Sequence, residues 1–87
     1  MAVNFSVDSS TSVQTLVEQG QASSATILNT DTNALYVLIG TGTASSTKYT
    51  VALNQGDYFE TPPFYREEAI TGIWAANGSG AALVTEF

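Results

Sequence analysis

The segment ALYVLIGTGTASSTKYTVAL, residues 34–53, contains two runs of strand-forming residues joined by a loop of Gly, Ser, Thr and Ala. Apolar and small or polar residues alternate in 48–53, which is typical of a strand with one face toward solvent. In 34–39 both faces are apolar, because Tyr36 and Leu38 occupy the second face. Such a strand is expected in the centre of a sheet or under a covering partner. The two strands are expected to pair as a wide hairpin.

Similar runs recur along the chain between clusters of Gly, Ser, Asn and Asp, a pattern typical of all-β folds. No segment shows the periodicity of an amphipathic helix. We therefore predict an all-β protein, a single-domain β-sandwich of jelly-roll or immunoglobulin-like type with about seven strands. The expected strands cover residues 12–18, 24–29, 34–39, 48–53, 56–60, 68–76 and 81–86.

Residues 12–87 are expected to form this domain, and residues 1–11 a flexible N-terminal arm that orders only against a neighbour, because apolar residues are isolated there. Between the strands, NTDTN (29–33) predicts turns capped by Asn and Asp side chains, and NQG (54–56) predicts a tight turn. NGSG (77–80) predicts a hairpin that joins the last two strands.

Size and charge both favour association with another protein. A chain of 87 residues buries only roughly 60–65% of its unfolded surface, and without Cys or His it has neither disulfides nor the usual zinc ligands. Only 11% of its residues are charged, so its surface can enter a protein interface without stranding charges. Two cations on a chain of net charge −6 disfavour nucleic acid and anionic membranes as partners.

The first residues, MAVNFSVDSS, lack the basic and apolar regions of a signal peptide. The longest apolar run, ALYVLI, is too short to span a membrane. Synthesis in a cytoplasm is therefore expected.

No catalytic signature is present, and we expect no enzymatic activity, no metal and no cofactor. Neighbouring carboxylates on a strand point to opposite faces, and a Ser near a Lys in a Ser-rich loop is a common coincidence. The pairs considered on these grounds are Asp57 with Glu60, Glu67 with Glu68, and Ser45 or Ser46 with Lys48. Oxygen ligands at Asn29, Asp31 and Asn33 match no complete calcium loop, so turn capping is the favoured interpretation.

The segment YFETPPFYREEAITGIWA, residues 58–75, gathers aromatic residues around a Pro pair that interrupts a strand. One interpretation is a corner between sheets in which Tyr58, Phe64 and Trp74 are part of the core. A second is an exposed patch in which Tyr65 and Arg66 anchor a protein interface. A sugar-binding platform formed by Trp or Tyr is a third interpretation.

Residues 25–87 resemble a family of small structural proteins encoded among the virion genes of tailed bacteriophages. The shared motifs occur in the same order: I-x-N, LYV-x-x-G, a Ser/Thr loop, YTV-x-L, G-x-Y-x-E-x-P, I-x-x-IWA, a Gly turn and a terminal VTE. This chain departs from the family at residues 66–68, where it has REE and a Gly is common.

The resemblance implies a non-enzymatic β-sandwich module of the virion, made in the cytoplasm of a bacterial host. We expect a capsid decoration or cement protein, with a neck or tail accessory protein, or a carbohydrate-binding module of a tail fibre, as alternatives. The expected partners are the major capsid protein or another virion protein, and further copies of the chain, most simply in a trimer. The residues expected at the interface are Val3, Phe5, Tyr36, Leu38, Phe64, Tyr65 and Arg66.

Overall fold

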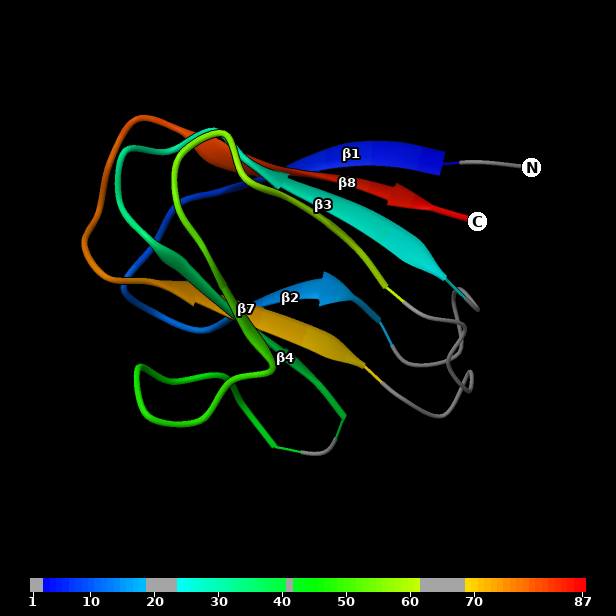
Figure 1. The fold of residues 1–87 in the computed structure, drawn as a ribbon, viewed down its shortest axis with the longest axis horizontal. Helices are drawn as coiled ribbons and strands as arrows, with labels where there is room; N and C mark the ends of the chain where they lie inside the picture. Colours follow the sequence, from blue (N-terminus) through cyan, green and yellow to red (C-terminus); the bar gives the residue numbers. More distant parts are fainter. Residues whose placement is uncertain (1–2, 19–23, 41, 62–68) are drawn as a thin grey trace.

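The computed structural model describes residues 3–18, 24–40, 42–61 and 69–87. These residues form eight strands in two antiparallel sheets and contain no helix (Figure 1). The strands are β1 (Val3–Asp8), β2 (Gln14–Val17), β3 (Ala25–Asn29), β4 (Leu35–Ile39), β5 (Val51–Leu53), β6 (Tyr58–Glu60), β7 (Ile70–Trp74) and β8 (Ala81–Glu86). The prediction of an all-β sandwich is confirmed.

The strand order defines the sandwich as a jelly roll. One sheet has the order β1-β8-β3-β6 and the other β2-β7-β4-β5. The pairs β1–β8, β2–β7, β3–β6 and β4–β5 nest around the β4–β5 hairpin, as in a long hairpin rolled into two sheets. The predicted pairing of the strands on either side of the long loop is thereby confirmed. The predicted hairpin of the last two strands is wrong, because β7 and β8 belong to different sheets.

All seven expected strands overlap strands of the structure, and the N-terminal residues form an additional one. The expectation of a flexible arm fails for Val3–Asp8, because this segment pairs over its whole length with β8 of the same chain. Val3, Phe5 and Val7 alternate with polar residues, which is the two-residue period of a strand. Figure 1 shows β1 beside β8, with both chain termini at the same end of the sandwich.

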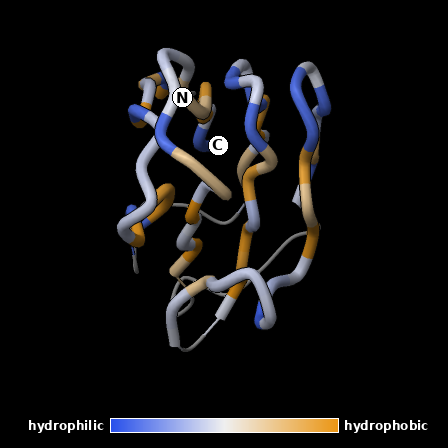
Figure 2. The backbone as a smooth tube through the Cα atoms, turned by 90° about the vertical axis from the view of Figure 1, so that its left-hand side faces the viewer, coloured by the Kyte–Doolittle hydropathy of each residue, from blue (hydrophilic) through white to orange (hydrophobic). Residues whose placement is uncertain are grey.

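The core lies between the two sheets and consists of inward-facing side chains from both. In Figure 2 the hydrophobic stretches lie along the middle of the strands, and hydrophilic residues gather at the turns of one end. In β2 a bulge between Thr15 and Val17 lets two consecutive residues, Leu16 and Val17, face inward. The buried cluster comprises Leu16, Val17, Ala25, Ile27, Leu35, Val37, Leu53, Ile70, Trp74, Ala82 and Val84.

The outer face of the β2-β7-β4-β5 sheet is covered by the loop that joins β4 to β5. Ala44 of this loop is buried, and its N–H donates a hydrogen bond to Thr71 Oγ1 of β7 at 3.0 Å. The ring of Tyr49 packs on that of Tyr36 at a centroid distance of 5.0 Å. Leu38 is buried on this face. The central position predicted for residues 34–39 is confirmed, and the covering segment belongs to the same chain.

Candidate functional site

Asn29 organises a buried polar cluster at the end of β3. Its Oδ1 accepts hydrogen bonds from Asp31 N at 3.0 Å and from Trp74 Nε1 at 3.1 Å. Its Nδ2 donates to Asn33 O at 3.0 Å and to Leu53 O at 2.9 Å. One side chain thus ties the turn between the two sheets to the core tryptophan and to the end of β5.

The Asp31 carboxylate joins this turn to the turn between β7 and β8. Its Oδ2 accepts from Asn33 N and Asn33 Nδ2, both at 2.9 Å, and its Oδ1 accepts from Gly80 N at 2.9 Å. The backbone hydrogen bonds from Asn33 and Gly80 hold the pKa of Asp31 below its ordinary value. The predicted turn capping by these side chains is therefore confirmed.

This contact also explains why the 77–80 segment is not a hairpin. Gly80 and Gly78 lie directly against Asp31, and a Cβ atom at Gly80 would come within 2.6 Å of Asp31 N. The segment is thereby attached to the turn between the sheets and carries the chain from one sheet to the other. The positive φ angles found among the described glycines are at Gly40, Gly42 and Gly56, so Gly78 and Gly80 serve close approach.

The side chains considered for catalysis support local turns. Asp57 Oδ2 accepts a hydrogen bond from Asn54 N at 2.9 Å, and Ser45 Oγ accepts one from Lys48 N at 3.0 Å. Glu60 is exposed at the end of β6, and residues 67 and 68 lie outside the described residues. Within the described ranges, no group of three or more His, Cys, Asp or Glu residues is placed to hold a metal ion.

The aromatic segment 58–75 is divided between core and surface. Trp74 is buried, as one interpretation predicted, so it is no platform for a sugar. Tyr58 was expected in the core and is 60% exposed, because alternation in β6 turns Phe59 inward and Tyr58 outward. Phe64, Tyr65 and Arg66 lie outside the described residues.

The outer face of the β1-β8-β3-β6 sheet carries an apolar row that no described segment covers. Leu28 of β3 lies between Leu83 of β8 and Tyr58 of β6 in the ladder, and Leu83 is 45% exposed. The row borders a shallow hollow of about 400 Å³. Other residues of this hollow are Asn4, Phe5, Thr26, Val84 and Thr85. We call the row of Leu28, Tyr58 and Leu83 with its polar neighbours Asn4, Thr26 and Thr85 the open face.

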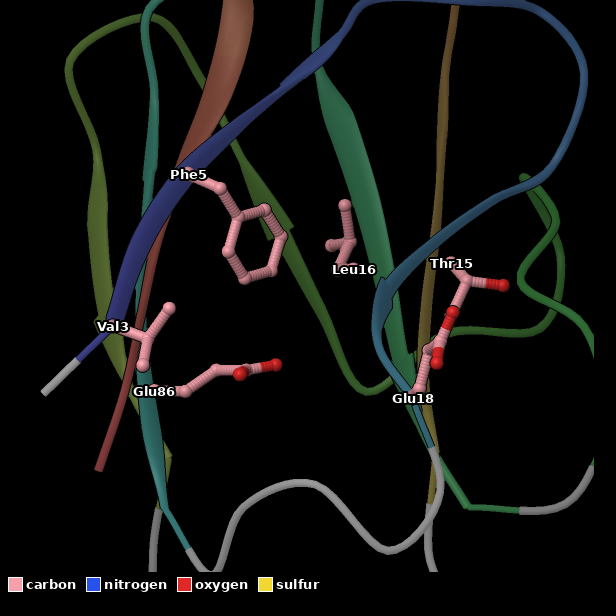
Figure 3. Close-up of a pocket in the computed structure, with 6 residues that line it drawn as sticks. All are labelled: Val3, Phe5, Thr15, Leu16, Glu18 and Glu86. Carbon is pink, nitrogen blue, oxygen red and sulfur yellow. The ribbon is translucent and has the colours of Figure 1, made fainter. Parts of the chain in front are cut away.

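A second hollow, of about 290 Å³, lies between the sheets at the edge formed by β1 and β2. Figure 3 shows Phe5 of β1 and Leu16 of β2 directed into it, together with the carboxylate of Glu86. Val3 is 51% exposed here and Phe5 37%, although both are on the inward side of their strand. We call this opening, lined by Val3, Phe5, Thr15, Leu16, Glu18 and Glu86, the edge hollow.

The surroundings of Glu86 in the edge hollow disfavour its ionised form. Partial burial, and secondarily the charge of Glu18, raise its pKa above the ordinary value of 4.5. The folded protein therefore binds this proton more tightly than the unfolded chain does, and stability falls as pH rises from 4.5 through the raised pKa. Glu86→Gln is expected to raise the Tm at pH 7, and the gain should vanish at pH values below 4.5.

Thermal unfolding followed by circular dichroism at both pH values tests this prediction. Glu60→Gln is the matched control, because it removes one negative charge from an exposed position. An equal gain for Glu86→Gln and Glu60→Gln at pH 7 would assign the effect to net charge and contradict the account.

The structure separates the residues expected at one interface. Val3 and Phe5 lie at the edge hollow, whereas Tyr36 and Leu38 lie on the opposite side, beneath or beside the covering loop. The open face was missed, although residues 25–29 and 81–86 carry apolar residues on both faces, as 34–39 does.

The described residues thus form a small jelly-roll domain in which the β4–β5 loop covers part of one outer sheet face and no described segment covers the other. Within the described residues, no helix is long and apolar enough to cross a membrane. Comparisons with protein-family models, with curated proteins and with solved structures find no match for this chain.

Proposed function

We propose that the chain is a non-enzymatic structural protein of a tailed-phage virion, which binds the head as a decoration or cement protein through its open face. The observation that carries this proposal is the asymmetry of the sandwich. The β4–β5 loop covers part of one outer face, where Leu38 and Thr71 are buried, whereas no described segment covers Leu28, Tyr58 and Leu83, which are exposed or half-buried on the other. The resemblance of residues 25–87 to virion proteins supports a location in the virion.

The chemistry of the open face suits a protein partner. An apolar centre with a polar, uncharged border is the composition of the buried core of protein interfaces, where charged residues are depleted. Asn4, Thr26 and Thr85 border the row, and Asn4 Nδ2 donates to Thr85 Oγ1 at 3.2 Å. Glu60 lies at the end of this border, beside Thr26 in the ladder.

Cementing acts by adding binding free energy across subunits of the shell. Apolar area removed from water contributes about 25 cal/mol per Å², and the gain is repeated at every copy. The proposed partner is the major capsid protein or another virion protein, and the place of action is the virion. A protein located in the neck or tail would bind through the same surface, but its copy number per particle would differ from that of a decoration protein.

Replacing Leu83 by lysine should remove docking without unfolding the domain. Leu83 is 45% exposed, so Leu83→Lys is tolerated in the free protein but places a charge in the interface. We expect affinity for assembled capsids to fall about a hundredfold, which corresponds to about 3 kcal/mol. Co-sedimentation with capsids that lack the protein measures this loss.

Ala52→Lys provides the matched control, because Ala52 is exposed on β5 of the other sheet. It adds the same charge at a distance from the open face. Equal binding by both variants, or equal loss, would contradict docking through the open face.

Carbohydrate binding is a second candidate function, favoured by the 60% exposure of Tyr58 at a hollow that Thr26 and Asn4 also line. An exposed aromatic ring with polar neighbours can stack on a sugar and hydrogen-bond its hydroxyls. Titration of glycans against the wild type and Tyr58→Ala separates the two functions. Saturable binding that is lost in Tyr58→Ala, together with no affinity for capsids, would replace the cement proposal by a glycan-binding module.

A further inference from the structure

We propose that β1 is the joint between two copies of this chain, paired antiparallel about Phe5 so that the two β1-β8-β3-β6 sheets form one continuous sheet. The inference goes beyond the proposed function, because it concerns the edge of the sandwich and holds whatever the open face binds. It also differs from the expected trimer, since the joint has a twofold axis.

The four edge strands of the two sheets are not equally suited to pairing. An exposed edge is protected when it is short, bulged, or carries Pro or charge. β5 and β6 have three residues each, Pro62 and Pro63 follow β6 in the sequence, and β2 has four residues with a bulge. β1 has six residues in regular register, and within the described residues it pairs with β8 alone. β1 is therefore the least protected edge.

The backbone of β1 presents hydrogen-bonding groups on its outer side that have no partner among the described residues. Ser9 N donates to Gly80 O at 3.1 Å, and this pair continues the register in which Val7 faces Ala82 and Phe5 faces Val84. Because bonded and non-bonded pairs alternate in an antiparallel ladder, the N–H and C=O groups of the intervening residues point away from β8. These residues are Asn4, Ser6 and Asp8.

The side chains of β1 are self-complementary about Phe5. In the antiparallel arrangement Phe5 faces Phe5 of the second copy, Asn4 faces Ser6, and Val3 faces Val7. Asn4 and Ser6 then exchange their outward backbone hydrogen bonds, and apolar side chains meet apolar side chains on the inner side. The paired segment contains no charge, because Asp8 lies beyond it.

The positions of the charged side chains also favour this register. They matter because the chain has a net charge of −6, so two copies repel each other. Glu86 is the neighbour of Val3 in the ladder, and Ala82 is the neighbour of Val7. Across the joint, one row of neighbouring side chains therefore contains Glu86 and Val3 of the first copy, followed by Val7 and Ala82 of the second copy. The two Glu86 carboxylates lie in different rows, so like charges are not placed opposite each other.

The edge hollow supplies a second, independent argument. Val3 and Phe5 face inward but are 51% and 37% exposed, because β1 and β2 leave the gap between the sheets open at this edge. A second β1 adds Phe5 and Val7 of the other copy next to these side chains. The arrangement extends the apolar layer across the joint and reduces exposure of Phe5.

Single cysteines test the register directly, because the natural chain has no Cys. Position 5 faces position 5 in a non-hydrogen-bonded pair, where the Cβ atoms of antiparallel strands approach to about 4.5–5.5 Å, within reach of a disulfide. Phe5→Cys is expected to cross-link with itself under mild oxidation. Val3→Cys should not, but should cross-link when mixed with Val7→Cys.

Native mass spectrometry of the full chain supplies the second readout. The wild type is expected to be dimeric, and Ser6→Pro, which removes an outward N–H, should be a folded monomer by circular dichroism. Ser6→Ala keeps that N–H and should remain dimeric. A monomeric wild type, a dimeric Ser6→Pro, or self-cross-linking of Val3→Cys as efficient as that of Phe5→Cys would each overturn the proposal.

Discussion

Asn29→Leu is expected to lower the free energy of unfolding by about 3–5 kcal/mol, the largest effect of any single substitution considered for this chain. Leucine has the same number and branching of side-chain heavy atoms and a larger volume, so the change leaves no cavity. It removes the partner of three buried groups, Asp31 N, Trp74 Nε1 and Leu53 O, and of the partly buried Asn33 O. A buried polar group without a partner costs about 1–3 kcal/mol.

Urea unfolding monitored by the fluorescence of the single tryptophan measures this loss. Trp74→Phe, followed by circular dichroism, is the comparison that removes one of the four hydrogen bonds together with part of the buried indole, and we expect it to cost about 1–3 kcal/mol. A smaller loss for Asn29→Leu than for Trp74→Phe would show that Asn29 does not organise the cluster.

Gly80→Ala is expected to lower the free energy of unfolding by about 3 kcal/mol. The new Cβ atom would lie 2.6 Å from Asp31 N, so the backbone of one turn must move. That movement breaks the hydrogen bond from Gly80 N to Asp31 Oδ1, which joins the two turns at 2.9 Å. The connection from β7 to β8 therefore requires a residue without a side chain at position 80.

Gly56→Ala is the control for this substitution. Gly56 has a φ of 82°, but no atom lies within 4 Å of a Cβ placed there. Alanine then pays only for the left-handed backbone, about 1–2 kcal/mol. Chemical denaturation of both variants under the same conditions compares them, and a cost at Gly56 equal to or above that at Gly80 would contradict the role assigned to close approach.

Local patterns predict which residues form strands, but not which strands pair. Runs of strand-forming residues between turn clusters identified seven of the strands, and the apolar second face of 34–39 correctly placed β4 inside its sheet. β1 was missed, although Val3, Phe5 and Val7 alternate with polar residues, because this short stretch pairs with a strand near the other end of the chain. Contacts so distant in sequence leave no local signal.

The 77–80 turn shows the same limit at the level of single residues. Two glycines between strands indicate a hairpin when only local conformation is considered. In the structure their role is to make room for Asp31, a residue far away in the sequence. A sequence does not distinguish a glycine that is needed for close packing from a glycine that is needed for a positive φ angle.

The open face was not predicted for a related reason. Leu28, Tyr58 and Leu83 come from three separate strands, and only the jelly-roll order makes them neighbours. Their apolar character on the solvent side was visible in the sequence, but so was that of Tyr36 and Leu38. The difference between the two faces arises from the β4–β5 loop, which covers one of them and not the other.

Quantitative mass spectrometry of purified particles of a phage that encodes this chain tests the proposal that the domain is a bound component of a virion. We expect the chain in mature particles at a copy number proportional to that of the major capsid protein, and its loss when Leu83→Lys replaces the wild type in the infecting genome. A chain that is abundant in infected cells but absent from mature particles would contradict the account.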